Sequence, residues 1–289
     1  MKGRTVFKWA IGAIAIVFLI GVGALVLLFV VGFWSLEKGE QHRRQFQAEL
    51  DSGRWDFGQQ PALFPVAQGI VKNDSEAIRE AAKSVPDLQA PGRDGATLLD
   101  FAVRRSWQHP ESVEAVKTLL SLGADPNYTN GTRNYFAMAN AVHSSAPVLR
   151  AMLEAGGNAN TRDEFSRPII LMNWYLGYYT NQARSRLELL LDHGADVNST
   201  MPKDDTDSSG YPLLLYRTAM GVKDGPAYAD ALLLLQRGAD SNRSAADGMT
   251  FKKMLKDHRA QFQRTNKSPP ADFAALWDWA EQHGLVQQN

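Results

Sequence analysis

Cysteine is absent from this 289-residue chain. Its absence excludes disulfide frameworks, thiolate nucleophiles, cysteine-ligated zinc, iron–sulfur clusters and a lipid anchor attached through cysteine. A protein without disulfides can function on either side of a membrane, so this observation leaves the compartment open. It does remove a large group of redox and metal-dependent activities.

The sequence also lacks an excess of charge of either sign. Basic and acidic residues number 31 each, so the formal net charge is zero. No overall field attracts the chain to nucleic acid or to acidic substrates, and we therefore expect no nucleic-acid partner. Hydrophobic residues make up 44% and charged residues 21%, which is typical of a folded globular protein.

Motifs of common enzyme chemistries are missing as well. The sequence contains no glycine-rich phosphate loop after a strand, no His-Glu-x-x-His and no Gly-x-Ser-x-Gly. The six histidines are scattered, and His193 and His283 each precede a glycine that ends a predicted helix, where an imidazolium interacts favourably with the helix C-terminus. We therefore predict no catalytic residues, no cofactor, no metal site and no small-molecule substrate.

One long apolar run is present at the N-terminus. Residues 9–34 contain no charged side chain, and as a helix they span roughly 39 Å, longer than a hydrocarbon core of about 30 Å. Trp9 and Trp34 stand where interfacial aromatic residues occur. A cleaved signal peptide has a shorter apolar region and a small-x-small cleavage site, which residues 31–36 lack. We predict an uncleaved transmembrane helix over residues 9–34.

The orientation of this helix follows from its flanks. Basic residues lie on both sides: Lys2, Arg4 and Lys8 before the run, and Lys38, Arg43 and Arg44 after it. Their numbers nearly balance, but a long C-terminal domain is translocated largely regardless of its charge. We predict a cytoplasmic tail at 1–8, a spacer at 35–60 with a short helix over 40–50, and a domain at 61–289. That domain is expected in the periplasm of a bacterium, held at the inner membrane.

A Gly-Ala-Asp-x-Asn turn recurs along this domain. Copies begin at Gly123, Gly194 and Gly238, with a degenerate copy at Gly156, so successive copies start 33, 38 and 44 residues apart. Each follows apolar residues at i, i+3 and i+4, which predicts a helix with one buried face. The glycine then falls just past the helix end, where a left-handed backbone carries no Cβ penalty. The aspartate of each turn is expected to bond local backbone rather than a metal.

Another short helix is predicted upstream of each of these helices, so that every unit contains a first helix and a second helix. The clearest copy is Asp94-Gly95-Ala96-Thr97-Leu98, and Asp247-Gly248-Met249-Thr250 is similar. Asp-Gly forms a tight turn, and Thr97 can cap the helix that follows. Looser copies open near residues 166 and 209.

The chain resembles the ankyrin repeat over about residues 62–285. The resemblance is carried by a turn, a first helix that begins Gly-x-Thr-x-Leu, and a second helix that ends in Leu-Leu-x-x-Gly-Ala-Asp-x-Asn. The resemblance implies an all-α ankyrin-repeat solenoid of helix-turn-helix units. Its parts are an N-terminal cap at 61–90, repeats at about 91–128, 129–161, 162–199 and 200–243, and a C-terminal cap at 244–289. The segments 134–138 and 174–179 depart from the repeat pattern.

The resemblance also implies a concave groove, lined by the turn tips and by exposed positions of the first helices. Trp, Tyr and Arg, which dominate interface hot spots, occur at several of these places. The candidate partner-binding residues are Arg93, Asp94, Arg104, Arg105, Trp107, Arg133, His143, Phe165, Trp174, Tyr175, Tyr178, Tyr211 and Arg217. For the aromatic cluster at 174–179, packing within the helix pair is an equally good interpretation.

These features lead us to expect a membrane-anchored module that binds a partner protein. By analogy with small, anchored, repeat-built bacterial proteins, a sharper expectation is an immunity protein that inhibits a secreted antibacterial toxin, such as a phospholipase acting on the inner membrane. The alternative is a structural tether or scaffold for an envelope complex.

Overall fold

The computed structural model describes residues 40–129, 136–173, 182–202, 210–223 and 226–287. Two units make up the chain, Met1–Trp55 and Asp56–Asn289. The predicted tail at 1–8 and the predicted membrane span at 9–34 lie outside the described residues. No helix within the described ranges combines the length and the apolar character that crossing a membrane requires.

The described part of the first unit is mainly a helix over residues 40–51, where a short helix was expected. Glu40 and Arg44 form an exposed pair one turn apart, at 3.5 Å. Phe46 is 40% exposed and packs edge-on against Trp55, with 4.8 Å between ring centroids. This local pair covers part of an apolar face on an otherwise polar helix.

The second unit begins before the predicted boundary at residue 61. Helix α2 (Arg54–Phe57) ends in Phe57, which is fully buried and contacts the Phe101 ring edge-on at 5.7 Å between centroids. Asp56, also buried, interacts with Arg104. The spacer expected over 35–60 therefore contributes its last residues to the folded unit, because Phe57 supplies apolar surface that the first repeat buries.

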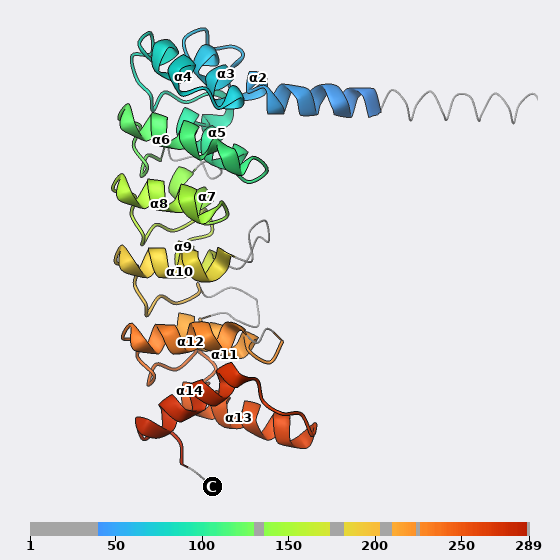
Figure 1. The fold of residues 1–289 in the computed structure, drawn as a ribbon, viewed down its shortest axis with the longest axis vertical. Helices are drawn as coiled ribbons and strands as arrows, with labels where there is room; N and C mark the ends of the chain where they lie inside the picture. Colours follow the sequence, from blue (N-terminus) through green and yellow to red (C-terminus); the bar gives the residue numbers. More distant parts are fainter. Residues whose placement is uncertain (1–39, 130–135, 174–181, 203–209, 224–225, 288–289) are drawn as a thin grey trace, which may run out of the picture. The chain divides into compact units, whose positions relative to one another are not determined.

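Pairs of helices stack one on another through the second unit (Figure 1). The first helices of the pairs are α3 (Phe64–Lys72), α5 (Leu98–Arg105), α7 (Ala137–Ala141), α9 (Ile169–Met172), α11 (Leu213–Met220) and α13 (Phe251–Arg264). Their partners are α4 (Ser75–Ala82), α6 (Val113–Ser121), α8 (Ala146–Glu154), α10 (Ala183–Asp192), α12 (Pro226–Gln236) and α14 (Ala271–Gln282). Short 3₁₀ turns, η1 (Arg93–Gly95) and η2 (Pro110–Ser112), flank α5.

Contacts between neighbouring pairs follow the layers of the stack. First helices meet first helices, as in α3–α5, α5–α7 and α11–α13, and second helices meet second helices, as in α4–α6, α6–α8 and α8–α10. In the described residues the only extended pairings are two isolated bridges, Arg162 with Pro168 and Thr200 with Pro212. The predicted all-α stack of helix pairs is thus confirmed for the described part of the chain.

The predicted apolar stripes form a core that runs along the stack. Leu119, Met152, Leu187 and Leu234 are each fully buried, one in the second helix of each successive repeat. At the C-terminal end, four apolar residues of α14 are buried: Phe273, Leu276, Trp277 and Ala280. Thr97 accepts a hydrogen bond from the backbone N–H of Asp100 (3.1 Å), which confirms the predicted cap of α5.

The glycine turns end their helices as expected. Gly123 and Gly194 have φ of 95° and 80°, and an added Cβ would meet nothing within 4 Å at either position, so the left-handed backbone alone requires glycine there. Asp125, Asp196 and Asp240 each accept a hydrogen bond from the backbone N–H two residues on, at 2.8 to 2.9 Å. These aspartates therefore serve the turn itself.

An asparagine ladder joins successive turns, a feature that we did not predict. The Asn127 side chain donates to the Gly156 carbonyl (2.9 Å) and accepts from the Asn158 N–H (2.7 Å). Asn160 repeats both bonds one repeat later, donating to the Gly194 carbonyl (2.9 Å) and accepting from the Asp196 N–H (2.7 Å). Each such residue ties its own turn to the next one.

Candidate partner-binding surface

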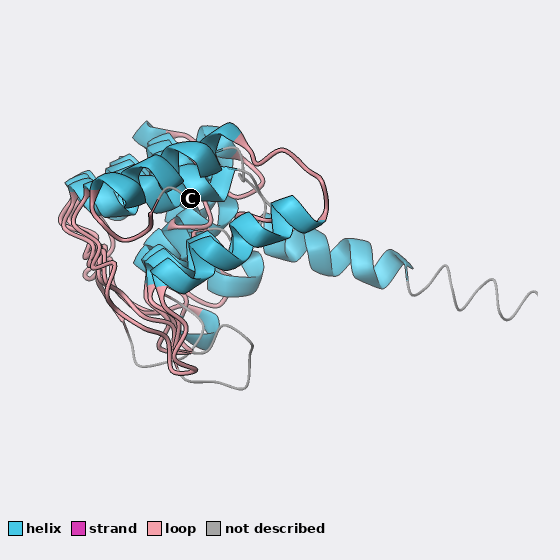
Figure 2. Ribbon diagram, turned by 90° about the horizontal axis from the view of Figure 1, so that it is seen from below, coloured by secondary structure: helices cyan, strands magenta, loops and turns pink. Residues whose placement is uncertain are grey.

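The loops of successive repeats run together along one side of the stack (Figure 2). The first predicted tip is η1, where Arg93 and Asp94 are both exposed. Asp94 and Gly95 have positive φ, at 55° and 91°, so the chain reverses sharply at the predicted Asp-Gly turn. The two side chains carry opposite charges on an outward-facing tip.

A second tip presents an aromatic ring on an ordered turn. Phe165 is 64% exposed, the most exposed large hydrophobic side chain among the described residues. The Asp163 carboxylate accepts hydrogen bonds from the backbone N–H groups of Phe165 (3.0 Å) and Arg167 (2.8 Å). It also pairs with the Arg167 guanidinium at 2.6 Å, and that guanidinium lies 4.7 Å from the centroid of the Phe165 ring. The turn thus holds the ring in place without burying it.

Tyr211 lies at a third tip and is half-buried. Its hydroxyl donates to Asp247 Oδ2 (3.0 Å), a residue of the next turn along the stack. The pKa of Asp247 is lowered because its carboxylate accepts hydrogen bonds, chiefly from the backbone N–H of Met249 and to a smaller extent from the Tyr211 hydroxyl. Tyr211 therefore links two tips and remains partly exposed.

Arg104, predicted to line the groove, belongs to a largely buried ion network. Its Nε donates to Asp100 Oδ2 (2.8 Å), and its Nη2 lies 3.5 Å from Asp56 Oδ1. Asn140 of α7 donates to the other oxygen of Asp100 (2.7 Å). Burial raises the pKa of both Asp56 and Asp100, and Arg104 offsets part of that effect in each case. The network joins α2, α5 and α7.

Arg105 and Trp107 also bond across repeats and are half-buried. Arg105 Nη2 donates to the Val71 carbonyl in α3 (3.1 Å). Trp107 Nε1 donates to the Asn140 carbonyl in α7 (3.2 Å). Both residues therefore help to hold neighbouring repeats together, with only part of each side chain at the surface.

His143 and Arg217 require a correction, because we expected both on the exposed face. His143 is 7% exposed and packs edge-on against Trp107 at 6.2 Å between centroids. Burial, with smaller contributions from nearby arginines, lowers the pKa of His143 to about 4. Arg217 is 2% exposed and donates to Asp230 Oδ2 (2.6 Å), a carboxylate that Arg184 also contacts (3.2 Å). Both side chains are therefore part of the interior.

Four other predicted residues lie outside the described residues, namely Arg133, Trp174, Tyr175 and Tyr178. Sequence reasoning overlooked two groups that shape the tips, Asp163 and Arg167, and assigned Asp247 only to its own Asp-Gly turn. The signal for Asp163 was present, because an aspartate that precedes a turn by two residues is typical of an Asx turn. The signal for Asp247 was weaker, because its bond to Tyr211 spans 36 positions.

Comparisons with known proteins agree with this architecture. Residues 94–131 match the ankyrin repeat family. An ankyrin repeat domain from Acinetobacter baumannii AYE is 18% identical, with 74% of this chain and 95% of that chain covered and a TM-score of 0.56. The ankyrin repeat protein EF0377 is 16% identical; the match covers 74% of this chain and 96% of that chain, with a TM-score of 0.53. The ankyrin repeat domain of Bcl-3, a member of the IκB family, is 22% identical. The match covers 66% of this chain and 76% of that chain, with a TM-score of 0.50.

Searched against curated proteins, the sequence has no match. The repeat match over residues 94–131 and the structural likenesses show the ankyrin-repeat fold. At 16 to 22% identity, the likenesses to solved structures carry the fold and leave the partner of this chain to be inferred from its own surface.

Proposed function

We propose that this protein is a non-enzymatic interaction module that binds a partner protein through its tip surface. The tip surface consists of Arg93, Asp94, Phe165, Arg167 and Tyr211, and the partly exposed faces of Arg104, Arg105 and Trp107 extend it along α5 and the turn that follows. The observation that carries the proposal is Phe165, which is 64% exposed. Burying such a ring under a partner contributes about 1.5–3 kcal/mol.

The order of the Phe165 turn supports this proposal. Asp163 fixes the backbone on both sides of the ring, and Arg167 packs over it. A side chain that is already held in place loses little conformational entropy when a partner covers it. Aromatic and arginine side chains in such positions are typical anchors of protein interfaces.

Affinity capture from detergent-solubilised membranes tests the role of the tip surface. The full-length wild type should recover a stoichiometric protein, and Phe165→Ser should lose it. Phe46→Ser is a matched control, because Phe46 is the other exposed large hydrophobic residue among those described and lies in the first unit. Equal recovery by wild type and Phe165→Ser would contradict the proposal.

We also propose that residues 9–34 anchor the chain in the bacterial inner membrane, with residues 61–289 in the periplasm. The uncharged apolar run and its flanks support this topology. Because the chain has no cysteine, single-cysteine variants can be labelled cleanly with a membrane-impermeant maleimide. In spheroplasts, exposed Ser84→Cys should react and Thr5→Cys should not. The reverse pattern would invert the topology, and equal labelling of both would argue against a span.

The partner that we propose is a secreted antibacterial toxin, such as a phospholipase that attacks the inner membrane. A binding surface anchored on the periplasmic side of that membrane would meet such an enzyme at its site of action, which is an argument by analogy. Cells that express in their periplasm a phospholipase encoded beside this gene should survive with the wild-type protein and die with Phe165→Ser. Failure of the wild type to protect would remove the immunity role and favour a structural tether.

A further inference from the structure

Helix α13 carries an unusual concentration of positive charge. Its cations are Lys252, Lys253, Lys256, Arg259 and Arg264, against one carboxylate, Asp257. Phe251, Met254 and Leu255 are buried against the stack, so the opposite face of the helix is turned away from it. Lys252, Lys256 and Arg259 follow i, i+4, i+7 spacing, which places them on one stripe of that helix.

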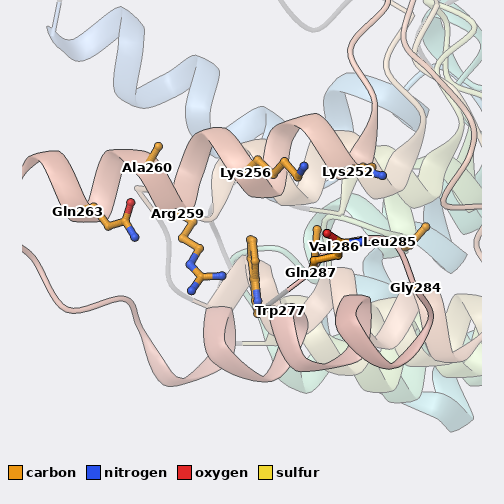
Figure 3. Close-up of a pocket in the computed structure, with 10 residues that line it drawn as sticks. All are labelled: Lys252, Lys256, Arg259, Ala260, Gln263, Trp277, Gly284, Leu285, Val286 and Gln287. Carbon is orange, nitrogen blue, oxygen red and sulfur yellow. The ribbon is translucent and has the colours of Figure 1, made fainter. Parts of the chain in front are cut away.

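This stripe borders a cleft between α13 and α14 (Figure 3). The cleft has a volume of about 470 Å³, and its lining includes these three cations and no carboxylate. Trp277, Leu285 and Val286 supply the apolar part of the lining; Leu285 is partly exposed, and the other two are buried. Arg259 lies over the Trp277 ring, 4.2 Å from its centroid, and this stacking holds the guanidinium at the mouth of the cleft.

A second cleft continues the first along the same helix. It has a volume of about 280 Å³ and shares Arg259 and Gln263 with the first cleft. Lys267 and Phe262 contribute to its lining, again without a carboxylate. From Lys252 to Gln263 the helix rises about 17 Å, the length of about five residues in an extended chain. The combined surface is therefore longer than a single bound anion requires.

Among the described residues, no carboxylate lines either cleft. Glu281 of α14 accepts a hydrogen bond from Trp277 Nε1 (2.6 Å) and lies outside both linings. Asp257 and Asp278 are exposed and do not belong to the lining of either cleft. In the described part of the chain, neither Lys252 nor Lys256 forms an ion pair.

We propose that the α13–α14 surface, defined by Lys252, Lys256, Arg259, Trp277 and Lys267, binds an acidic segment of a protein partner. Glutamate or aspartate side chains of that segment meet the cationic stripe, and an apolar side chain lies against the partly exposed Leu285. The length of the surface favours a peptide over a free anion. This site lies on the last helix pair, lies apart from Phe165 and does not depend on the tip surface.

Fluorescence anisotropy with the full-length protein in detergent tests this site. The probe is a fluorescein-labelled peptide of glutamates interrupted by leucine, compared with the same peptide carrying glutamine in place of glutamate. We expect the acidic peptide to bind and the glutamine peptide to bind much more weakly, because only the acidic side chains form charge-assisted hydrogen bonds with the stripe. The double variant Lys252→Gln/Lys256→Gln should weaken binding at least about fivefold.

Lys253→Gln/Arg264→Gln is the matched control, because it removes two exposed cations of α13 that line neither cleft. This variant should weaken binding less than about twofold, and Phe165→Ser should leave it unchanged. Equal weakening by the two double variants would overturn the site, because attraction would then follow net charge alone. The proposed peptide site would also be overturned if the protein did not bind the acidic peptide but bound phosphatidylserine-containing vesicles in a way that depends on Lys252 and Lys256. That result would identify the surface as a lipid-binding one.

Discussion

The first helices of the inner repeats and the tips of the turns use the same residue types for different purposes. On α5, Arg104 and Arg105 bond to residues of neighbouring helices, and Trp107 does the same just after it. At the tip, Phe165 is 64% exposed although Arg167 and Asp163 surround it. An arginine or an aromatic residue in a repeat is therefore fully available to a partner only where the stack does not already use it, and Arg104, Arg105 and Trp107 offer only their partly exposed faces.

The position of each element in the stack explains this difference. Helix α5 has a neighbouring first helix on each side, α3 and α7, so long side chains along it find acceptors in both directions. The loops of successive repeats project beyond the helices (Figure 2), and α13 belongs to the last helix pair (Figure 1). Polar groups within the stack need internal partners because water cannot reach them. Groups on the tips and on α13 do not need such partners.

Removing the Arg104 guanidinium should have the largest effect on stability. Arg104→Ala leaves the buried carboxylates of Asp56 and Asp100 without their shared cation, which costs about 3–5 kcal/mol of unfolding free energy. Urea unfolding followed by circular dichroism measures this loss. Arg150→Ala is the control, because Arg150 is exposed and its ion pair with Glu154 is long, at 4.0 Å. This substitution should cost less than about 0.5 kcal/mol of unfolding free energy. Similar losses in both would erase the distinction between buried and exposed arginines.

Acid should destabilise the interior through His143. Burial lowers the pKa of His143 from 6.5 to about 4, so the folded state takes up this proton at lower pH than the unfolded state does. The neutral imidazole's contribution is fully present above pH 6.5 and is lost as the pH falls towards 4, by about 3 kcal/mol. Unfolding free energies of wild type and His143→Gln, compared at several pH values, isolate this contribution. Parallel pH profiles for the two proteins would contradict it.

The asparagine ladder should contribute an intermediate amount. Asn160→Ala removes two hydrogen bonds between successive turns and should cost about 1–2 kcal/mol. Asn242 occupies the same place in the last Gly-Ala-Asp-x-Asn turn, and its side chain makes no such bond to a later repeat in the described residues. Asn242→Ala should therefore cost less than about 0.5 kcal/mol in the same denaturation experiment. Equal costs would show that the ladder bonds do not stabilise the stack.

Replacing Phe165 should have the smallest effect on stability, although it removes the proposed anchor. Phe165→Ala should change the unfolding free energy by no more than about 0.5 kcal/mol, because the ring is exposed and makes few contacts within the stack. Thermal unfolding monitored by circular dichroism measures this. A loss of several kcal/mol would mean that the ring supports the fold, which would weaken its assignment to a binding surface.

Local features of the fold were predictable because they depend on neighbours within a few residues. Gly123 and Gly194 end their helices in the left-handed region, Thr97 caps α5, and Asp125 bonds its own turn. The candidate site was less predictable. Arg93, Asp94 and Phe165 are exposed as expected, whereas His143 and Arg217 are interior residues.

By itself, the sequence determined the repeat, its period, the helix ends and the apolar face of each helix. These depend on backbone geometry and on side-chain spacing within one repeat. Only the tertiary structure decided which polar side chains are exposed. Whether an arginine such as Arg217 is buried depends on what another helix brings to it, here Asp230 of α12. Neighbouring repeats settle that question, because a charge can leave water only where groups of opposite charge or hydrogen-bond acceptors meet it.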